Sequence, residues 1–196
     1  MSARTLERLR ALLREEGGLI ATLIPDTGSE DRATSGTDQG TSSPATLAAE
    51  GPRTRSRREE YELLVEAIYE GYLLHYGAPR VVLAPEADLG VLAGDRLYAI
   101  GLARLVALGD TAAVAELADT ISLSALAQGS GQHALADAVW AAGARAVGWG
   151  SSAVHRRAKD MVLARAQGAL AAMRTSALAM PAPMPLEAPV TTATFP

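Results

Sequence analysis

Apolar side chains recur at three- and four-residue spacing along most of the chain, which is the pattern of amphipathic helices. The spacing predicts long helices over residues 59–76, 88–108, 110–128 and 132–148, and a last one from Ser151 or Ser152 to about Arg174. Residues 2–16 predict a shorter amphipathic helix that stops at Gly17 and Gly18. No segment alternates with the two-residue period of a strand. We therefore expect an all-α fold, a helical bundle with a short separate N-terminal helix.

The segment 88–108 differs from the other predicted helices because it is apolar on nearly every face. This pattern is typical of a helix surrounded by others, and we expect it to be the central one. Gly90, Gly94 and Gly101 fall near one face, where a second helix can approach closely. About five long helices offer limited cover, so we also expect one side of this helix to lack an intramolecular neighbour.

Composition divides the chain into four regions. These are an amphipathic helix (1–16), a flexible linker (17–58) in which Leu47 is the one large apolar residue after Pro25, a helical domain (59–175), and an extended Pro-rich tail (176–196). The tail retains apolar side chains that a purely solvated segment does not need, and we expect it to bind a partner; the alternative is a disordered tail. The candidate partner-binding residues are Leu178, Met180, Met184, Leu186, Val190 and Phe195.

The overall composition narrows the class of protein. The chain has 196 residues, 48% of them hydrophobic, which is enough for a core, and no cysteine. Charged residues interrupt the N-terminus where a signal peptide needs an apolar run, so we expect a cytoplasmic protein. A net charge of -4 argues against broad attraction to nucleic acid. No segment predicts a membrane span, although a partner could bring the chain to a membrane.

Side chains with catalytic potential are scattered. His75, His133 and His155 lie in different segments without metal-ligand spacing, and we expect structural or solvent-facing roles for them. The serines lack a paired base, and we expect no cofactor, no metal and no catalytic residue. Two further groups have a structural and a functional interpretation. The run Arg53, Arg55, Arg57 and Arg58 could grip phosphate or anionic lipid, but a solvated linker end is favoured; Tyr69, Tyr72, Tyr76 and Tyr98 could line a lipid pocket, but ordinary core packing is favoured.

Two segments of the predicted helix pair carry a family resemblance. The first reads Leu92-Ala93-Gly94-Asp95-Arg96-Leu97-Tyr98 and the second runs from Leu102 to Leu108-Gly109-Asp110. They resemble the trans-polyprenyl diphosphate synthases, loosely over residues 59–174 and best over 89–132. The resemblance implies the isoprenoid synthase fold and a reaction in which magnesium, held by two aspartate-rich motifs, binds an allylic diphosphate.

This chain lacks the two aspartate-rich motifs on which the chemistry of the family depends. The helix expected to carry the first motif reads Glu70-Gly71-Tyr72-Leu73-Leu74-His75-Tyr76-Gly77, without aspartate, and residues 140–150 contain no carboxylate for the second. The resemblance therefore implies a non-catalytic, truncated relative that acts as a partner or regulatory subunit, in particular of a prenyl diphosphate synthase. The alternative is a structural accessory subunit of an unrelated larger complex, including one at a membrane.

Overall fold

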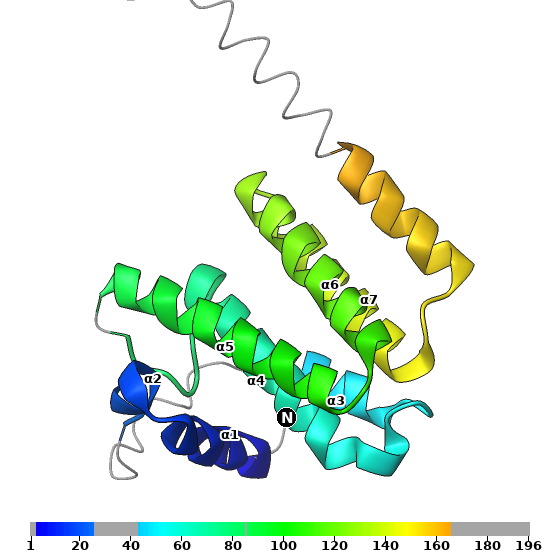
Figure 1. Cartoon of the computed structure of the whole chain (residues 1–196). Helices are drawn as coiled ribbons and strands as arrows, with labels where there is room; N and C mark the ends of the chain where they lie inside the picture. Colours follow the sequence, from blue (N-terminus) through cyan, green and yellow to red (C-terminus); the bar gives the residue numbers. More distant parts are fainter. Residues whose placement is uncertain (1–2, 26–42, 85, 166–196) are drawn as a thin grey trace, which may run out of the picture.

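The computed structural model describes residues 3–25, 43–84 and 86–165. Every regular element in these ranges is a helix, which confirms the all-α class (Figure 1). The elements are α1 (Ala3–Glu16), α2 (Gly18–Thr22), α3 (Pro44–Glu50), a 3-10 turn (Arg55–Arg57), α4 (Arg58–Tyr76), α5 (Ala87–Ala107), α6 (Thr111–Gly129) and α7 (His133–Trp149). Residues 153–165 form a further helix, drawn yellow to orange. None of the helices described is long and apolar enough to cross a bilayer.

Side-chain caps fix two of the helix boundaries that the sequence predicts. The Asp110 carboxylate accepts the backbone N–H of Ala113 at 3.0 Å at the start of α6, directly after Gly109 with its φ of 79°. The Ser152 hydroxyl accepts the backbone N–H of His155 at 3.1 Å and caps the helix 153–165. Both caps satisfy backbone donors that would otherwise have no partner.

The central helix is α4, and the expectation that residues 88–108 hold this place is wrong. One core cluster lies around Trp140 and is formed by α3, α4, α6 and α7 with Leu105 of α5, and a second lies between α1, α2, α4 and α5 around Leu97. The buried residues of α4 lie on nearly every side of that helix, whereas those of α5 fall on one side only. The side chains of α5 are apolar on nearly every side, but part of this apolar surface faces solvent instead of another helix.

The N-terminal helix is not separate, which corrects the sequence expectation. Leu9 and Leu13 of α1 are fully buried in the second cluster, where they share the core with Val81 and Leu97. The physical reason is that the leucine stripe of α1 has a complementary apolar surface on α4 and α5, which periodicity within α1 cannot show.

The linker expected over residues 17–58 is wrong for its described parts. Residues 18–22 form α2, and α3 buries small alanines against α4 and α7. The Thr54 hydroxyl, fully buried, donates to the carbonyl of Ala48 at 2.7 Å. Small side chains allow close packing without large apolar residues, and composition therefore misjudges this segment. Residues 26–42 lie outside the described residues.

The last helix meets α6 through a polar side. Lys159 lies against α6, whereas the apolar Leu163 is 44% exposed. The side that meets α6 is polar because a carboxylate of α6 attracts this helix, as described below.

Glycines set the closest helix contacts. The three glycines of α5 all face α4, as predicted: a Cβ on Gly94 would lie 3.0 Å from the carbonyl oxygen of Gly71, and one on Gly101 would lie 2.4 Å from Cγ1 of Ile68. A second close contact joins the end of α3 to α7, where a Cβ on Gly51 would lie 2.1 Å from the carbonyl oxygen of Gly148. Glycine is required at these crossings because any side chain would separate the backbones.

We predict that Gly51→Ala destabilises the fold by about 1–3 kcal/mol, the usual cost of overpacking, because the clash is with rigid backbone atoms of α7. Urea unfolding followed by circular dichroism measures the change. Gly129→Ala is the matched control, since no atom lies within 4 Å of its Cβ position. Equal stabilities of the two variants would contradict the close α3–α7 contact.

Candidate functional site

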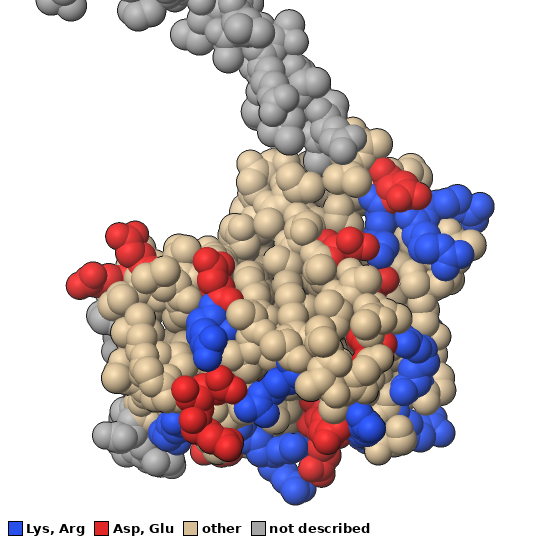
Figure 2. All heavy atoms as spheres, viewed as in Figure 1, with Lys and Arg blue, Asp and Glu red and all other residues tan. Residues whose placement is uncertain are grey.

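The solvent-facing side of α5 carries exposed apolar residues that no intramolecular contact explains. Val91, Leu92 and Val106 are 46%, 57% and 55% exposed, and the small Ala99 and Ala103 lie exposed between them. We call these five residues, together with the half-buried Leu102, the α5 face. Figure 2 shows a broad surface without charged side chains over α6 and the adjoining part of α5, and charged side chains of both signs over the rest of α5. Contiguous exposed apolar surface of this kind is typical of protein interaction sites.

The spacing within the α5 face suits a second helix. Leu92, Ala99 and Val106 are seven residues apart, and Leu102 lies between the last two, which is the spacing of a coiled-coil seam. Alanine at the middle of the seam permits close approach of a partner backbone. The arrangement therefore presents larger side chains toward its ends and a shallow centre.

Charged residues border the α5 face and are held by intramolecular contacts. Glu16, at the end of α1, binds Arg96 at 3.1 Å and Arg104 at 2.9 Å. Asp95 projects from the same side of α5 as Leu92 and lies 3.2 Å from Nε2 of His75. These contacts keep Arg96 and Arg104 at the edge of the α5 face that lies next to α1. Asp95 is the acidic residue within the face.

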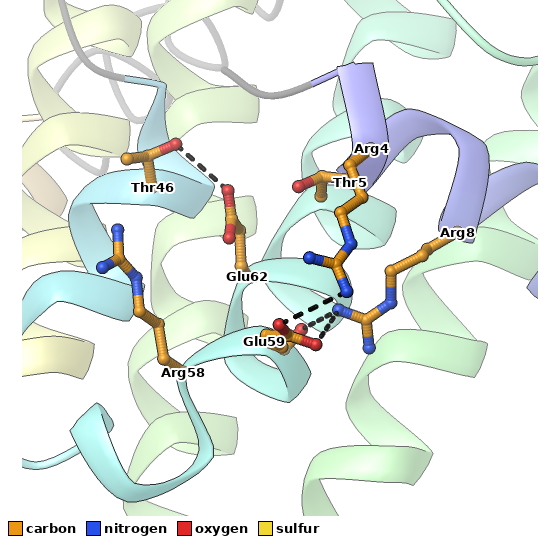
Figure 3. Close-up of a pocket in the computed structure, with 7 residues that line it drawn as sticks. All are labelled: Arg4, Thr5, Arg8, Thr46, Arg58, Glu59 and Glu62. Atoms are coloured by element: carbon orange, nitrogen blue, oxygen red, sulfur yellow. Dashed lines mark hydrogen bonds and ion pairs between the residues drawn. The ribbon is translucent and has the colours of Figure 1, made fainter.

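A charged cleft of about 450 Å³ lies between α1, α3 and α4 (Figure 3). Arg4 and Arg8 point from α1 toward Glu59 at the start of α4, with N–O distances of 3.8 and 3.1 Å. On the opposite wall Glu62 accepts a hydrogen bond from the Thr46 hydroxyl at 3.4 Å. The cleft thus mixes both signs of charge, and its ion pairs attach α1 to α4 rather than form an anion site.

The arginines of the run 53–58 are exposed to solvent, as we favoured, but the segment is not the end of a linker because three of them bind groups of the protein. Arg53 donates to the carbonyl of Val147 at 3.0 Å and to Asp110 at 3.3 Å, linking α7 to the start of α6. Arg57 reaches Glu60, and Arg58 reaches Glu50, each at 3.9 Å. The segment is therefore part of the folded body.

The four tyrosines singled out from the sequence do gather, together with Trp140. Tyr69 packs edge-on against Trp140 with ring centroids 4.9 Å apart, and Tyr72 stacks on Tyr69 at 5.7 Å. The Tyr72 hydroxyl accepts a hydrogen bond from Gln128 at 2.6 Å, and Tyr98 stacks on His75 at 5.4 Å. Tyr69, Tyr72 and Tyr98 fill space between helices, which supports the core-packing interpretation for these three, whereas Tyr76 is 45% exposed.

The histidines each have a local partner. His75 faces Asp95, His133 lies 2.5 Å from Gln128, and His155 lies 2.5 Å from Glu116. Within the described ranges, no three His, Asp or Glu side chains are arranged to hold a metal ion. The residues proposed from the sequence to bind a partner, Leu178 to Phe195, lie outside the described residues.

Two buried carboxylates on α4 are the residues that sequence reasoning missed. Glu66 and Glu70 are both fully buried. Glu70 Oε1 accepts the backbone N–H groups of Arg80 and Val81 at 2.6 Å each and that of Val82 at 3.3 Å. The carboxylate thereby fixes the connector between α4 and α5. Their four-residue spacing within an otherwise apolar stretch is the signal that could have found them.

Glu66 is held in a different electrostatic environment. Arg80 Nη2 lies 2.5 Å from Glu66 Oε1, and the Arg80 guanidinium also bonds Glu70 Oε2 through Nε at 3.3 Å. Burial raises the pKa of Glu66 from 4.5 to about 7, although the charge of Arg80 acts in the opposite direction. The folded state therefore binds this proton more tightly than the unfolded chain does.

We predict that the free energy of unfolding falls as pH rises from about 4.5 to 7, because Glu66 must then lose a proton that the folded state favours. The stabilising contribution is complete below the unfolded pKa and is lost through the folded pKa. Glu66→Gln should flatten this part of the pH profile, measured by urea unfolding at each pH. Glu15→Gln, on the exposed side of α1, is the control. A profile that Glu66→Gln leaves unchanged would contradict the assignment.

Comparison with protein-family models, curated proteins and solved structures finds no match to this chain.

Proposed function

We propose that this protein is a non-catalytic helical subunit that binds a partner protein through the α5 face. The observation that carries the proposal is the exposure of Leu92 and Val106 on a helix whose opposite side is buried. Fully burying such side chains contributes about 1.5–3 kcal/mol each, which gives an interface two strong anchors. The partner surface that fits is a helix with an apolar seam and a basic residue opposite Asp95.

The proposed partner is a catalytic polyprenyl diphosphate synthase. This choice rests on the resemblance of residues 89–132, which fall on α5 and α6, to that family. In the resemblance, the stretch from Glu70 to Gly77 takes the place of the first aspartate-rich motif, and it contains no aspartate. A subunit without these carboxylates would contribute binding and not magnesium chemistry.

We predict that the α5 face carries complex formation. Ala99→Glu should weaken binding to the synthase encoded in the same genome by at least tenfold, because it buries a carboxylate at the centre of the seam. Ala115→Glu, at an exposed position of α6 outside the face, should leave binding unchanged. Light scattering of the purified mixture gives the complex mass, and titration calorimetry gives the affinity.

The outcomes separate the surface from the partner. A complex that Ala99→Glu leaves intact would overturn the α5 face as the interface. Absence of a complex between the two purified wild-type proteins would overturn the synthase as the partner. Circular dichroism of each variant confirms that α5, whose outer side alone is changed, remains folded.

We also predict that the chain alone does not elongate an allylic diphosphate. Supplied with isopentenyl diphosphate and magnesium, it should give no prenyl product longer than the starting allylic diphosphate. The reason is that the helix expected to bind the diphosphate offers no paired aspartates. Product analysis with radiolabelled isopentenyl diphosphate measures this, with the catalytic synthase as the positive control. Magnesium-dependent elongation at an ordinary enzymatic rate would overturn the non-catalytic assignment.

A further inference from the structure

An apolar hollow lies between α6, α7 and the helix 153–165, and no residue of α5 lines it. Its volume is about 190 Å³. Its walls are mostly aliphatic and come from all three helices: Leu123 from α6, Leu135, Ala138, Val139 and Ala142 from α7, and Ala158 and Val162 from the last helix. We call this hollow the α6–α7 groove. The polar side chains in this lining are Glu116, Thr120, His155 and Lys159, of which Glu116 contacts both His155 and Lys159.

An ion cluster sets the distance between the last helix and α6, and this distance determines the width of the groove. Glu116 is nearly fully buried, and its two oxygens lie 2.5 Å from Nε2 of His155 and 3.0 Å from Nζ of Lys159. Lys159 also donates to Asp119 at 2.7 Å. These contacts involve long side chains from both helices, so they keep the backbones apart where short apolar residues would let them close. In Figure 1 the yellow-to-orange helix accordingly stands off from α6 and α7.

The volume of the groove limits the size of the ligand that it can hold. A cavity of about 150 Å³ with aliphatic and aromatic walls is known to bind benzene, so a hollow slightly larger suits a compound of about one ring. Apolar walls with a few convergent polar groups are the usual composition of a small-molecule site. The walls supply binding through burial, and the polar end fixes the orientation of the ligand.

The charge of the polar end selects a neutral ligand group. Glu116 and Asp119 supply two carboxylates against the one ammonium of Lys159 and the imidazole of His155. Burial acts to lower the pKa of Lys159, but its hydrogen bonds to Asp119 and Glu116 outweigh this effect and keep the pKa above its ordinary value. Lys159 therefore stays charged and already paired. A ligand carboxylate would meet Glu116, and an ammonium would compete with Lys159.

Hydrogen-bonding capacity points to the same kind of group. An ammonium has three donors, and Lys159 directs two of them to Glu116 and Asp119. Each oxygen of the Glu116 carboxylate can accept more than the one hydrogen bond described. A hydroxyl can accept from Lys159 and donate to Glu116, and it adds no charge to the cluster.

We propose that the α6–α7 groove binds a compact uncharged molecule of about one ring that carries a single hydroxyl group, of the alcohol or phenol class. The ring lies among Leu135, Val139 and Val162, and the hydroxyl bridges Glu116 and Lys159. This site is independent of the α5 face.

The test uses the full chain and four one-ring probes: phenol, toluene, benzoate and benzylammonium. Amide chemical shifts in NMR titrations give both the affinity and the location. Phenol should bind about fivefold more tightly than toluene, the effect of about one hydrogen bond, and the two charged probes should bind more weakly than phenol. Shift changes should centre on α6, α7 and the helix 153–165.

Variants test the two ends of the groove separately. Ala142→Phe should fill the apolar part and abolish binding of both phenol and toluene, whereas Ala141→Phe, exposed on α7 and outside the lining, should bind as wild type does. Lys159→Met should weaken phenol binding toward that of toluene. Toluene affinity should be retained because the contact between His155 and Glu116 still holds the last helix against α6, and this measurement checks that the groove is intact. Arg157→Met is the charge-matched control.

Three results would overturn the proposal. They are no saturable binding of phenol at the groove, benzoate or benzylammonium affinity equal to that of phenol, and phenol affinity that Ala142→Phe leaves unchanged.

Discussion

The close backbone crossing of α4 and α5 sets the arrangement of the other helices. A Cβ on Gly71 would lie 2.9 Å from the carbonyl oxygen of Gly94, so the two helices meet with no side chain between them at this point. With α5 this close, α1 and α2 can cover α4 and α5 together from one side, while α3, α6 and α7 cover α4 from the other. The remaining side of α5 then has no neighbour among the described helices.

Burial of two carboxylates in the central helix removes their hydration, and the same carboxylates hold the connector between α4 and α5. Glu70 offsets its loss of hydration with backbone N–H donors of residues 80–82, and it thereby fixes the turn that brings α5 back along α4. Glu66 depends on the single guanidinium of Arg80, and its raised pKa reflects that incomplete compensation. The connector between the two helices is thus held by charge, and Val81 and Val82 add apolar burial to it.

The two candidate surfaces arise for different physical reasons. The α5 face is exposed because no described helix covers it, and its seam spacing suits a long partner helix. The α6–α7 groove persists because a buried ion cluster holds the last helix away from α7. A macromolecular partner therefore suits the first surface, whereas the second is the size of a small molecule.

Local sequence determined the helices themselves. Periodicity, glycine stops and the caps at Asp110 and Ser152 fixed the long elements because these signals act within a few residues of the chain. The three glycines of α5 also indicated a close helix contact before its partner was known. These are properties of single helices, and neighbours in sequence suffice to specify them.

Only the tertiary structure decided which side of each helix is covered. It showed that α4 and not α5 is central, that α1 belongs to the core, and that Glu66, Glu70 and Glu116 meet cations or backbone donors far along the chain. Such contacts depend on how helices pack, and the same amphipathic pattern is compatible with several packings. The α5 face could be anticipated from its apolar pattern, but the α6–α7 groove could not, because its width is set by side chains from separate helices.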